Sequence, residues 1–149
     1  MSESIKVTLT VTNGAYSISD VVGGLITFGN AVRVSGGKSV INSVKLAGVS
    51  ALAYELWLLN ADIATPAEDN AAFTIVVADE PKVLGIIPIA ATDYYAAQSA
   101  FNVANPRQVG LQVQAAPGTT TIYAYLKATA TTTPGTTTLY LTVDFEYLD

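Results

Sequence analysis

The chain has 149 residues with 7 Lys and Arg against 12 Asp and Glu, a formal net charge of -5, and it contains neither Cys nor His. This composition excludes a His/Cys zinc site, a cysteine nucleophile, a catalytic triad with histidine and a structural disulfide. Charged residues make up only 13 % of the chain, against about 25 % in a typical globular domain. What remains is a binding or structural role, or an enzyme that works with carboxylates, Lys, Tyr or a hard metal alone. Of these we expect a binding or structural protein that is not an enzyme, with no cofactor and no bound metal.

The length fits one domain over residues 1–149, because single domains most often have about 100–150 residues. The seven basic residues are scattered singly, whereas a nucleic-acid partner requires clustered Lys and Arg. The first residues do not resemble a signal peptide, and no apolar run approaches the ~20 residues that span a bilayer. We expect synthesis in a cytoplasm and neither a nucleic-acid nor a membrane partner.

Alternating apolar and polar residues, the period of a β-strand, dominate the sequence. The first such run covers residues 5–12 and is followed by a turn at Asn13-Gly14. A β-rich stretch at 20–28 contains Gly23-Gly24, which indicates a bulge or a close backbone approach. These features predict two strands in the first thirty residues or so of the chain.

The next pair of expected strands flanks a glycine-rich turn. Residues 31–34 and 39–46 lie on either side of Ser35-Gly36-Gly37-Lys38 and are interpreted as a hairpin. Gly36-Gly37-Lys38-Ser39 also resembles the end of a phosphate-binding loop, but Val32 stands where that motif needs a glycine, and a strand pattern follows instead of a helix. Residues 54–60 are apolar on both faces, which predicts a central strand.

One short helix is expected over residues 66–73. Thr65-Pro66-Ala67-Glu68 matches a capping box, in which Pro66 occupies the first helical position, and Asp69 to Phe73 would complete the helix. Residues 83–89 then predict a strand, and Pro88 within it favours a sheet edge or a bulge.

The last part of the chain alternates most regularly. The Thr-rich stretch 119–138 is expected to form an ordered β-hairpin and not a stalk, because β-branched Thr fits a pleated sheet. About eight or nine strands at this spacing predict an all-β fold, a single antiparallel β-sandwich that is jelly-roll-like. Three strand patterns carry the alternation in this region: 109–113, 122–128 and 139–145.

Two groups of acidic residues are candidates for chemistry. Asp144 and Glu146 lie on one strand face about 7 Å apart, a separation compatible with paired catalytic carboxylates, but the sequence around them indicates a solvated outer face. Glu68-Asp69-Asn70, with Asp62 upstream, could offer oxygen ligands to calcium, but the spacing of a calcium loop is absent. Helix capping explains these acids instead.

Aromatic residues are the stronger candidates for function. Tyr94 and Tyr95 lie in an expected loop, and Tyr123 and Tyr125 lie opposite the apolar stripe of a strand. Aromatic residues with few charges around them are typical of interface cores, and the same tyrosines could stack on sugars. The pattern leaves open whether they are buried within one subunit or in an interface, such as the closed contact of a homo-oligomer that covers sheet edges.

Short motifs that keep a fold and carry no catalysis are spread over residues 10–89. They are TVTNGAYS at 10–17, DVVGGL at 20–25, INSV at 41–44, LWLL at 56–59, Pro66, DNAAF at 69–73 and LG at 84–85. With these motifs the chain resembles a group of tailed-bacteriophage virion proteins of about this length. The resemblance covers most of the chain and is weakest in the Thr-rich end.

The resemblance implies a capsid decoration or cement protein, a β-sandwich on the outer capsid that is often a trimer and reinforces contacts between capsomers. It implies the major capsid protein as partner, a homo-oligomer with a trimer favoured, and location on the capsid surface of the virion. It brings no catalytic or cofactor residues. A carbohydrate-binding or adhesin module of a tail or head fibre is the alternative that fits the same pattern.

Overall fold

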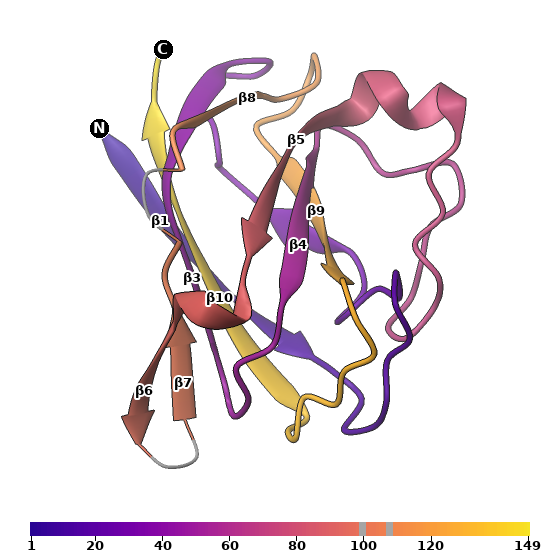
Figure 1. Ribbon diagram of the computed structural model, residues 1–149. Helices are drawn as coiled ribbons and strands as arrows, with labels where there is room; N and C mark the ends of the chain where they lie inside the picture. The colour runs from indigo at the N-terminus through magenta and orange to yellow at the C-terminus, as the bar shows by residue number, and fades with distance from the viewer. Residues whose placement is uncertain (99–100, 107–108) are drawn as a thin grey trace.

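A computed structural model describes residues 1–98, 101–106 and 109–149, and within them two antiparallel β-sheets pack face to face (Figure 1). The strands of the six-stranded sheet lie in the order β1-β10-β3-β7-β6, and β8 pairs with a different part of β3. Their bounds are β1 Ser2–Thr10, β3 Lys38–Gly48, β6 Tyr94–Gln98, β7 Phe101–Ala104, β8 Leu111–Gln114 and β10 Thr138–Tyr147.

The four-stranded sheet has the order β2-β9-β4-β5. Its strands are β2 Ile26–Phe28, β4 Tyr54–Leu59, β5 Val83–Ile89 and β9 Ile122–Ala128, and two 3-10 helices are present, η1 Val77–Lys82 and η2 Ala91–Asp93. Of the residues that the structure describes, none belongs to a helix with the length and apolarity needed to cross a membrane.

The chain alternates between the two sheets as in a jelly roll. Apart from the β6–β7 hairpin, one sheet consists of β1, β10, β3 and β8. The other consists of β2, β9, β4 and β5. The expectation of an antiparallel, jelly-roll-like β-sandwich is therefore confirmed.

The core between the sheets follows from the period of two in each strand. The odd-numbered residues of β10 from Leu139 to Phe145 are buried and meet the inward residues of β2, β4 and β9. The rings of Phe28 and Phe145 pack edge to face across the sandwich, 5.4 Å between centroids. The even-numbered residues of β10 consequently face outward, away from the core.

Several expectations for single strands are confirmed. β4 is central, between β9 and β5, and β5 with its Pro88 is an edge strand. Gly23 has a positive φ of 88°, and a Cβ atom there would lie 3.0 Å from the Cβ of Leu9. The close backbone approach expected at Gly23-Gly24 is thus present, because a larger side chain would collide with β1.

Both expected hairpins are wrong in their pairing. Residues 31–34 form bends and not a strand, so the Gly36-Gly37 turn connects a loop to β3. In the Thr-rich stretch, β9 and β10 are both ordered strands, but they lie in different sheets and do not pair with each other. In this jelly roll most consecutive strands go to opposite sheets, as β9 and β10 do, and alternation within a strand does not reveal which sheet it joins.

The helix expected over residues 66–73 is also wrong, because no residue of this range is helical. Asn70 has a positive φ of 65°, which a right-handed α-helix excludes. The Asn70 amide donates to the Val21 carbonyl oxygen, and the Val21 amide donates to the Ala71 carbonyl oxygen, both at 2.8 Å. Pairing with a distant segment has overridden the local capping motif.

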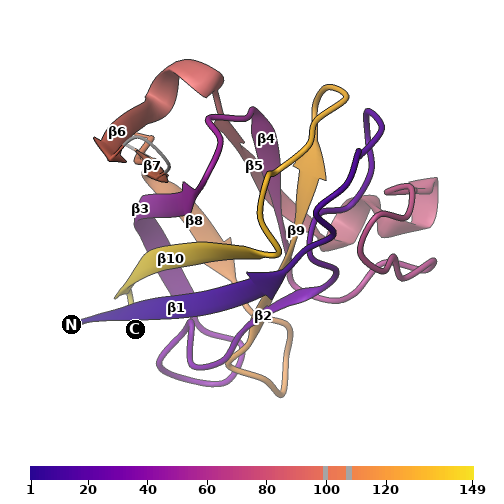
Figure 2. The ribbon, with the colours of Figure 1, turned by 90° about the horizontal axis from the view of Figure 1, so that it is seen from below.

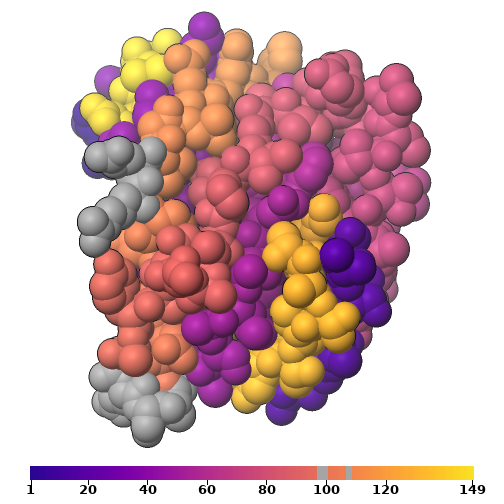
Figure 3. All heavy atoms as spheres, in the orientation of Figure 1, coloured from indigo at the N-terminus to yellow at the C-terminus, as the bar shows by residue number. Residues whose placement is uncertain are grey.

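Residues 61–76, which we call the cover segment, lie instead over the outer face of the four-stranded sheet (Figure 2). Their pink atoms form the right-hand side of the molecule in Figure 3. Phe73 packs against Trp57 and Tyr125, with ring centroids 5.2 and 5.3 Å apart. A second, smaller apolar cluster results, formed by Val21, Leu59, Ile63, Ala67 and Tyr125.

Asp69 fastens the cover segment to the rest of the chain. Its carboxylate accepts hydrogen bonds from the Tyr16 hydroxyl at 2.6 Å and the Gly23 amide at 2.7 Å. The amide and hydroxyl of Thr12 donate to the same carboxylate at 3.0 and 2.7 Å. Burial, with the hydrogen bond to Asp69, raises the pKa of Tyr16 to about 12. We call this group of contacts the Asp69 latch.

Asp79, in η1, holds the two ends of the cover segment together. Its buried carboxylate accepts hydrogen bonds from the amides of Ala64 and Val76 at 2.8 and 3.2 Å and pairs with the Lys82 ammonium at 3.1 Å. Burial raises the pKa of Asp79, but these three partners outweigh it, so that the pKa lies below its ordinary value. The cover segment is therefore fixed near both ends by Asp79 and near its middle by Asp69.

Candidate binding groove

The outer face of the six-stranded sheet carries a row of side chains that crosses five strands. Thr8, Tyr140, Ala47, Val103 and Tyr95 are successive cross-strand partners on β1, β10, β3, β7 and β6. Residues directly opposite each other in antiparallel strands point to the same face. Strands that are far apart in the sequence thus assemble one surface row.

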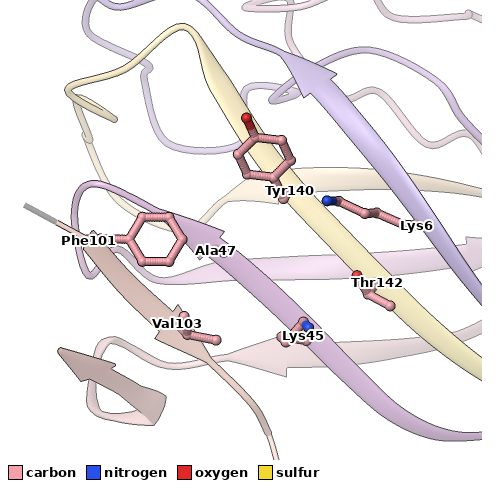
Figure 4. A pocket seen from close by; sticks show the side chains of 7 residues that line it. All are labelled: Lys6, Lys45, Ala47, Phe101, Val103, Tyr140 and Thr142. Carbon is pink, nitrogen blue, oxygen red and sulfur yellow. The ribbon is translucent and has the colours of Figure 1, made fainter. Parts of the chain in front are cut away.

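A groove of about 310 Å³ is hollowed into this face (Figure 4). The methyl group of Ala47 lies between the larger side chains of Val103 and Tyr140 on the neighbouring strands, so the small residue creates the hollow. The aromatic side chains of Phe101 and Tyr140 remain 36 % and 39 % exposed. The lining residues are Lys6, Lys45, Ala47, Phe101, Val103, Tyr140 and Thr142.

Two lysines bring positive charge to the groove. Lys6, Thr142 and Lys45 are cross-strand partners in the row next to Tyr140 and Ala47. The Lys6 ammonium lies 4.8 Å from the centroid of the Tyr140 ring, within the range of a cation–π contact. Neither groove lysine belongs to the ion pairs found among the described residues, which are those of Lys82 and Lys127. Lys45 nevertheless lies near enough to Asp144 to act on its charge.

The candidate carboxylates Asp144 and Glu146 lie on the same outer face but do not line the groove. Asp144 is bound by the hydroxyls of Ser4 and Ser43, which hold its pKa below the ordinary value, and Lys45 adds to this effect. Glu146 accepts a hydrogen bond from the Asn42 side-chain amide at 2.7 Å. The two carboxylates thus have separate partners and no shared cavity.

The four candidate tyrosines are not brought together. Tyr95 lies on β6 in the surface row and is 60 % exposed, whereas Tyr94 beside it faces the core, and burial raises its pKa well above the ordinary value. Tyr123 and Tyr125 lie on β9, in the other sheet, and contribute to the cluster under the cover segment. Of the four, Tyr95 lies nearest to the groove along the strand register.

Tyr125 is fully buried and does not reach the surface. Its hydroxyl donates to Asp62 at 2.7 Å. Burial and this hydrogen bond raise the pKa of Tyr125 to about 12. The oxygens of Asp62 and Asp69, which the sequence offered as calcium ligands, thus accept hydrogen bonds from the chain itself.

The segment that resembles a phosphate-binding loop has a structural role. The Ser39 hydroxyl is buried and donates to the Ala31 carbonyl oxygen at 2.6 Å. The Lys38 amide donates to the Asp149 side chain at 2.6 Å. Ser39 belongs to β3 and not to a helix, so the segment lacks the helix N-terminus that such a loop requires.

Most residues of the groove were not among the sequence candidates. Alternation places Lys6, Tyr140 and Thr142 on outward faces, but it does not show that β1, β10, β3 and β7 are neighbours. Phe101 and Val103 belong to a short hairpin strand with no clear alternation. The signal that could have located the groove is a small outward residue, Ala47, on a strand that is otherwise long and regular.

The fold and the groove define an all-β jelly-roll protein with an apolar, positively charged hollow on one sheet face. Comparison with known protein families, with characterised proteins and with solved structures found no significant match.

Proposed function

We propose that the chain is a structural protein of a bacteriophage virion, which binds the outside of the capsid and reinforces contacts between capsomers as a decoration or cement protein. The observation that carries the proposal is the outer face of the six-stranded sheet, where Phe101 and Tyr140 are partly exposed beside a hollow. Exposed aromatic residues with few charges are typical of interface cores. The motifs over residues 10–89 that resemble phage virion proteins supply the class of partner.

Such a protein would act without chemistry. A partner that binds only the assembled capsid shifts the assembly equilibrium toward it by mass action. The proposed location is accordingly the capsid surface, and the proposed partner is the major capsid protein.

Co-sedimentation with capsids of the phage that encodes the chain tests this function. We expect the protein to pellet with capsids, and the double variant Phe101→Ala/Tyr140→Ala to bind at least about tenfold more weakly, since central aromatic anchors carry most interface energy. The matched control removes two exposed aliphatic side chains elsewhere, Ile18→Ala/Val77→Ala, and should bind like the parent. Absence of the protein from purified virions by mass spectrometry, with no co-sedimentation, would contradict the proposal.

We also propose a homo-oligomer, with a trimer as the resemblance implies. In the described part of the chain, β1, β6 and β8 are the edge strands of one sheet, and β2 and β5 are those of the other. Unpaired strand edges are covered in many proteins by a second chain. Light scattering coupled to gel filtration measures the mass, and a monomer at micromolar concentration would contradict this part of the proposal.

Binding of a glycan by a tail or head fibre is the second candidate function. The observation that favours it is the pair of aromatic side chains, Phe101 and Tyr140, beside hydroxyl and ammonium groups in one groove. A glycan array provides the test. Binding that is lost in Tyr140→Ala would support this second function, and an array without hits would count against it.

A further inference from the structure

The groove joins two kinds of surface in adjacent rows. One row offers the hollow over Ala47, between Val103 and Tyr140, and the next offers the ammonium groups of Lys6 and Lys45. The remainder of the chain is acidic, since the net charge is -5. A site that is positive and apolar on an acidic protein selects a ligand that carries negative charge beside an apolar group.

We propose that the groove binds an extended acidic segment of a partner protein, with one apolar side chain seated over Ala47 and flanking carboxylates paired with Lys6 and Lys45. This inference rests on the proposed function, in which the partner is a protein of the capsid. It adds the chemistry of the segment that is recognised.

Strand geometry sets the spacing of the segment. Lys6 and Lys45 lie two strands apart through Thr142, so their backbones are roughly 10 Å from each other. An extended peptide covers that distance in about three residues. Side chains on the same face of an extended peptide are two or four residues apart. Carboxylates four residues apart, with an apolar residue midway, therefore all face the groove, and the flexible lysine side chains take up the remaining few ångströms.

Neighbouring charges restrict where a carboxylate can bind. Asp144 lies on β10 in the row next to that of Lys6 and Lys45, on the side away from Ala47. Its side chain is already bound by the hydroxyls of Ser4 and Ser43. It repels an anion at that end, which directs the ligand toward the Ala47 end of the groove. Because the whole chain repels anions at long range, the attraction is confined to close contact and weakens with salt.

The scarcity of hydrogen-bonding groups favours a protein segment over a glycan. Each hydroxyl of a buried sugar needs a partner, because an unsatisfied polar group is costly. The lining residues offer the Thr142 and Tyr140 hydroxyls and the two lysines, whereas Ala47, Phe101 and Val103 offer only apolar surface. An apolar side chain covers that surface without such a cost.

Peptide titration followed by amide NMR of the full chain tests the inference without any capsid. The probe is acetyl-Glu-Glu-Phe-Glu-Glu-amide, and the two comparison peptides replace Phe by Ser or every Glu by Lys. With the probe, we expect changes in amide chemical shift that are confined to residues of β1, β3, β7 and β10. Either comparison peptide should bind at least about fivefold more weakly.

Variants of the chain identify the groove as the binding site. Lys6→Glu/Lys45→Glu should weaken binding of the probe about tenfold, because two attractive pairs become repulsive. Arg33→Glu/Lys38→Glu changes the net charge equally, at exposed positions away from the groove, and should bind like the parent. Ala47→Phe fills the hollow without a change of charge and should also weaken binding about tenfold.

Three results would overturn the inference. They are shifts outside the groove, equal binding of the Phe and Ser peptides, and tighter groove binding by hexagalacturonate, an acidic glycan, than by the probe. Capsid co-sedimentation of the same variants separates the two proposals. If the parent pellets with capsids and Lys6→Glu/Lys45→Glu pellets equally well, the capsid function stands and the groove inference fails.

Discussion

The outer faces of the two sheets carry similar aromatic residues but are completed differently. On the four-stranded sheet, Trp57 and Tyr125 pack against Phe73 of the cover segment. On the six-stranded sheet, Tyr140 and Phe101 stay partly exposed, and no described segment of the chain lies over them. The covered face shows how this chain satisfies aromatic strand residues when it supplies the covering itself.

The difference between the two faces indicates that folding does not account for the hollow on the bare face. A scattered exposed apolar residue is normal on a protein surface, but a hollow bordered by aromatic side chains and lysines is not required for folding. We expect the covered face to contribute to stability and the bare face to contribute to the proposed binding. Substitutions on the two faces should accordingly separate stability from binding.

The largest effect is expected from removing the buried aromatic ring of the covered face. Tyr125→Ala should lower the free energy of unfolding by about 3–5 kcal/mol, because it leaves a cavity in the second apolar cluster. Tyr140→Ala removes the same atoms from the bare face and should lower it by only about 1 kcal/mol, because the ring is partly exposed and loses mainly its contact with Lys6 and its strand propensity. Urea unfolding measures both, and equal losses would remove the distinction between the faces.

A smaller effect is expected at the Asp69 latch. Asp69→Ala should lower the free energy of unfolding by about 2–3 kcal/mol, because it leaves the buried Tyr16 hydroxyl without this acceptor. Fluorescence of Trp57, the single tryptophan, should shift to the red if the cover segment loosens. The control is Glu68→Ala, an equal loss of charge at an exposed neighbour, and an equally large effect there would contradict a specific latch.

The smallest effect concerns acid. Both Asp79 and Asp144 have pKa values below the ordinary 3.8 in the folded chain, so the stability that each contributes is present above about pH 3.8 and is lost as the pH falls through the folded pKa. Asp79→Asn should reduce this acid sensitivity more than Asp144→Asn, since Asp79 is buried at the end of the cover segment.

Thermal unfolding at pH 6 and pH 3 measures the acid effect. The difference in melting temperature between the two pH values should be smallest in Asp79→Asn and intermediate in Asp144→Asn. A parent chain that is equally stable at both pH values would contradict the prediction.

The sequence was sufficient for features that depend on period and local chemistry. Alternation located most strands, and apolar residues on both faces of 54–60 predicted the central position of β4. The two hairpins and the helix failed for one reason: their partners are distant in the chain. Thr65-Pro66-Ala67-Glu68 is a good capping box, but pairing of residues 70–73 with residues 19–21 replaces the helical hydrogen bonds.

The groove was beyond prediction for the same reason. Lys6 and Tyr140 could be placed on outward faces by parity, but their contact depends on the pairing of β1 with β10. Tyr125 shows the converse, because parity directed it outward and the cover segment then buried it. In both cases sheet order and a long connection decided exposure, and neither is encoded by a local pattern.

The position of β10 between β1 and β3 has a consequence for the newly made chain. β1 pairs with β10 from Ser2↔Glu146 to Thr10↔Thr138. β1 therefore cannot form this pairing until nearly all of the described chain has been synthesised. Until then β1 and the adjoining edge of β3 lack their partner and are open to mispairing with other chains. Such non-local pairing is slow to form, and yield in a host cell should depend on how well these edges are shielded during translation.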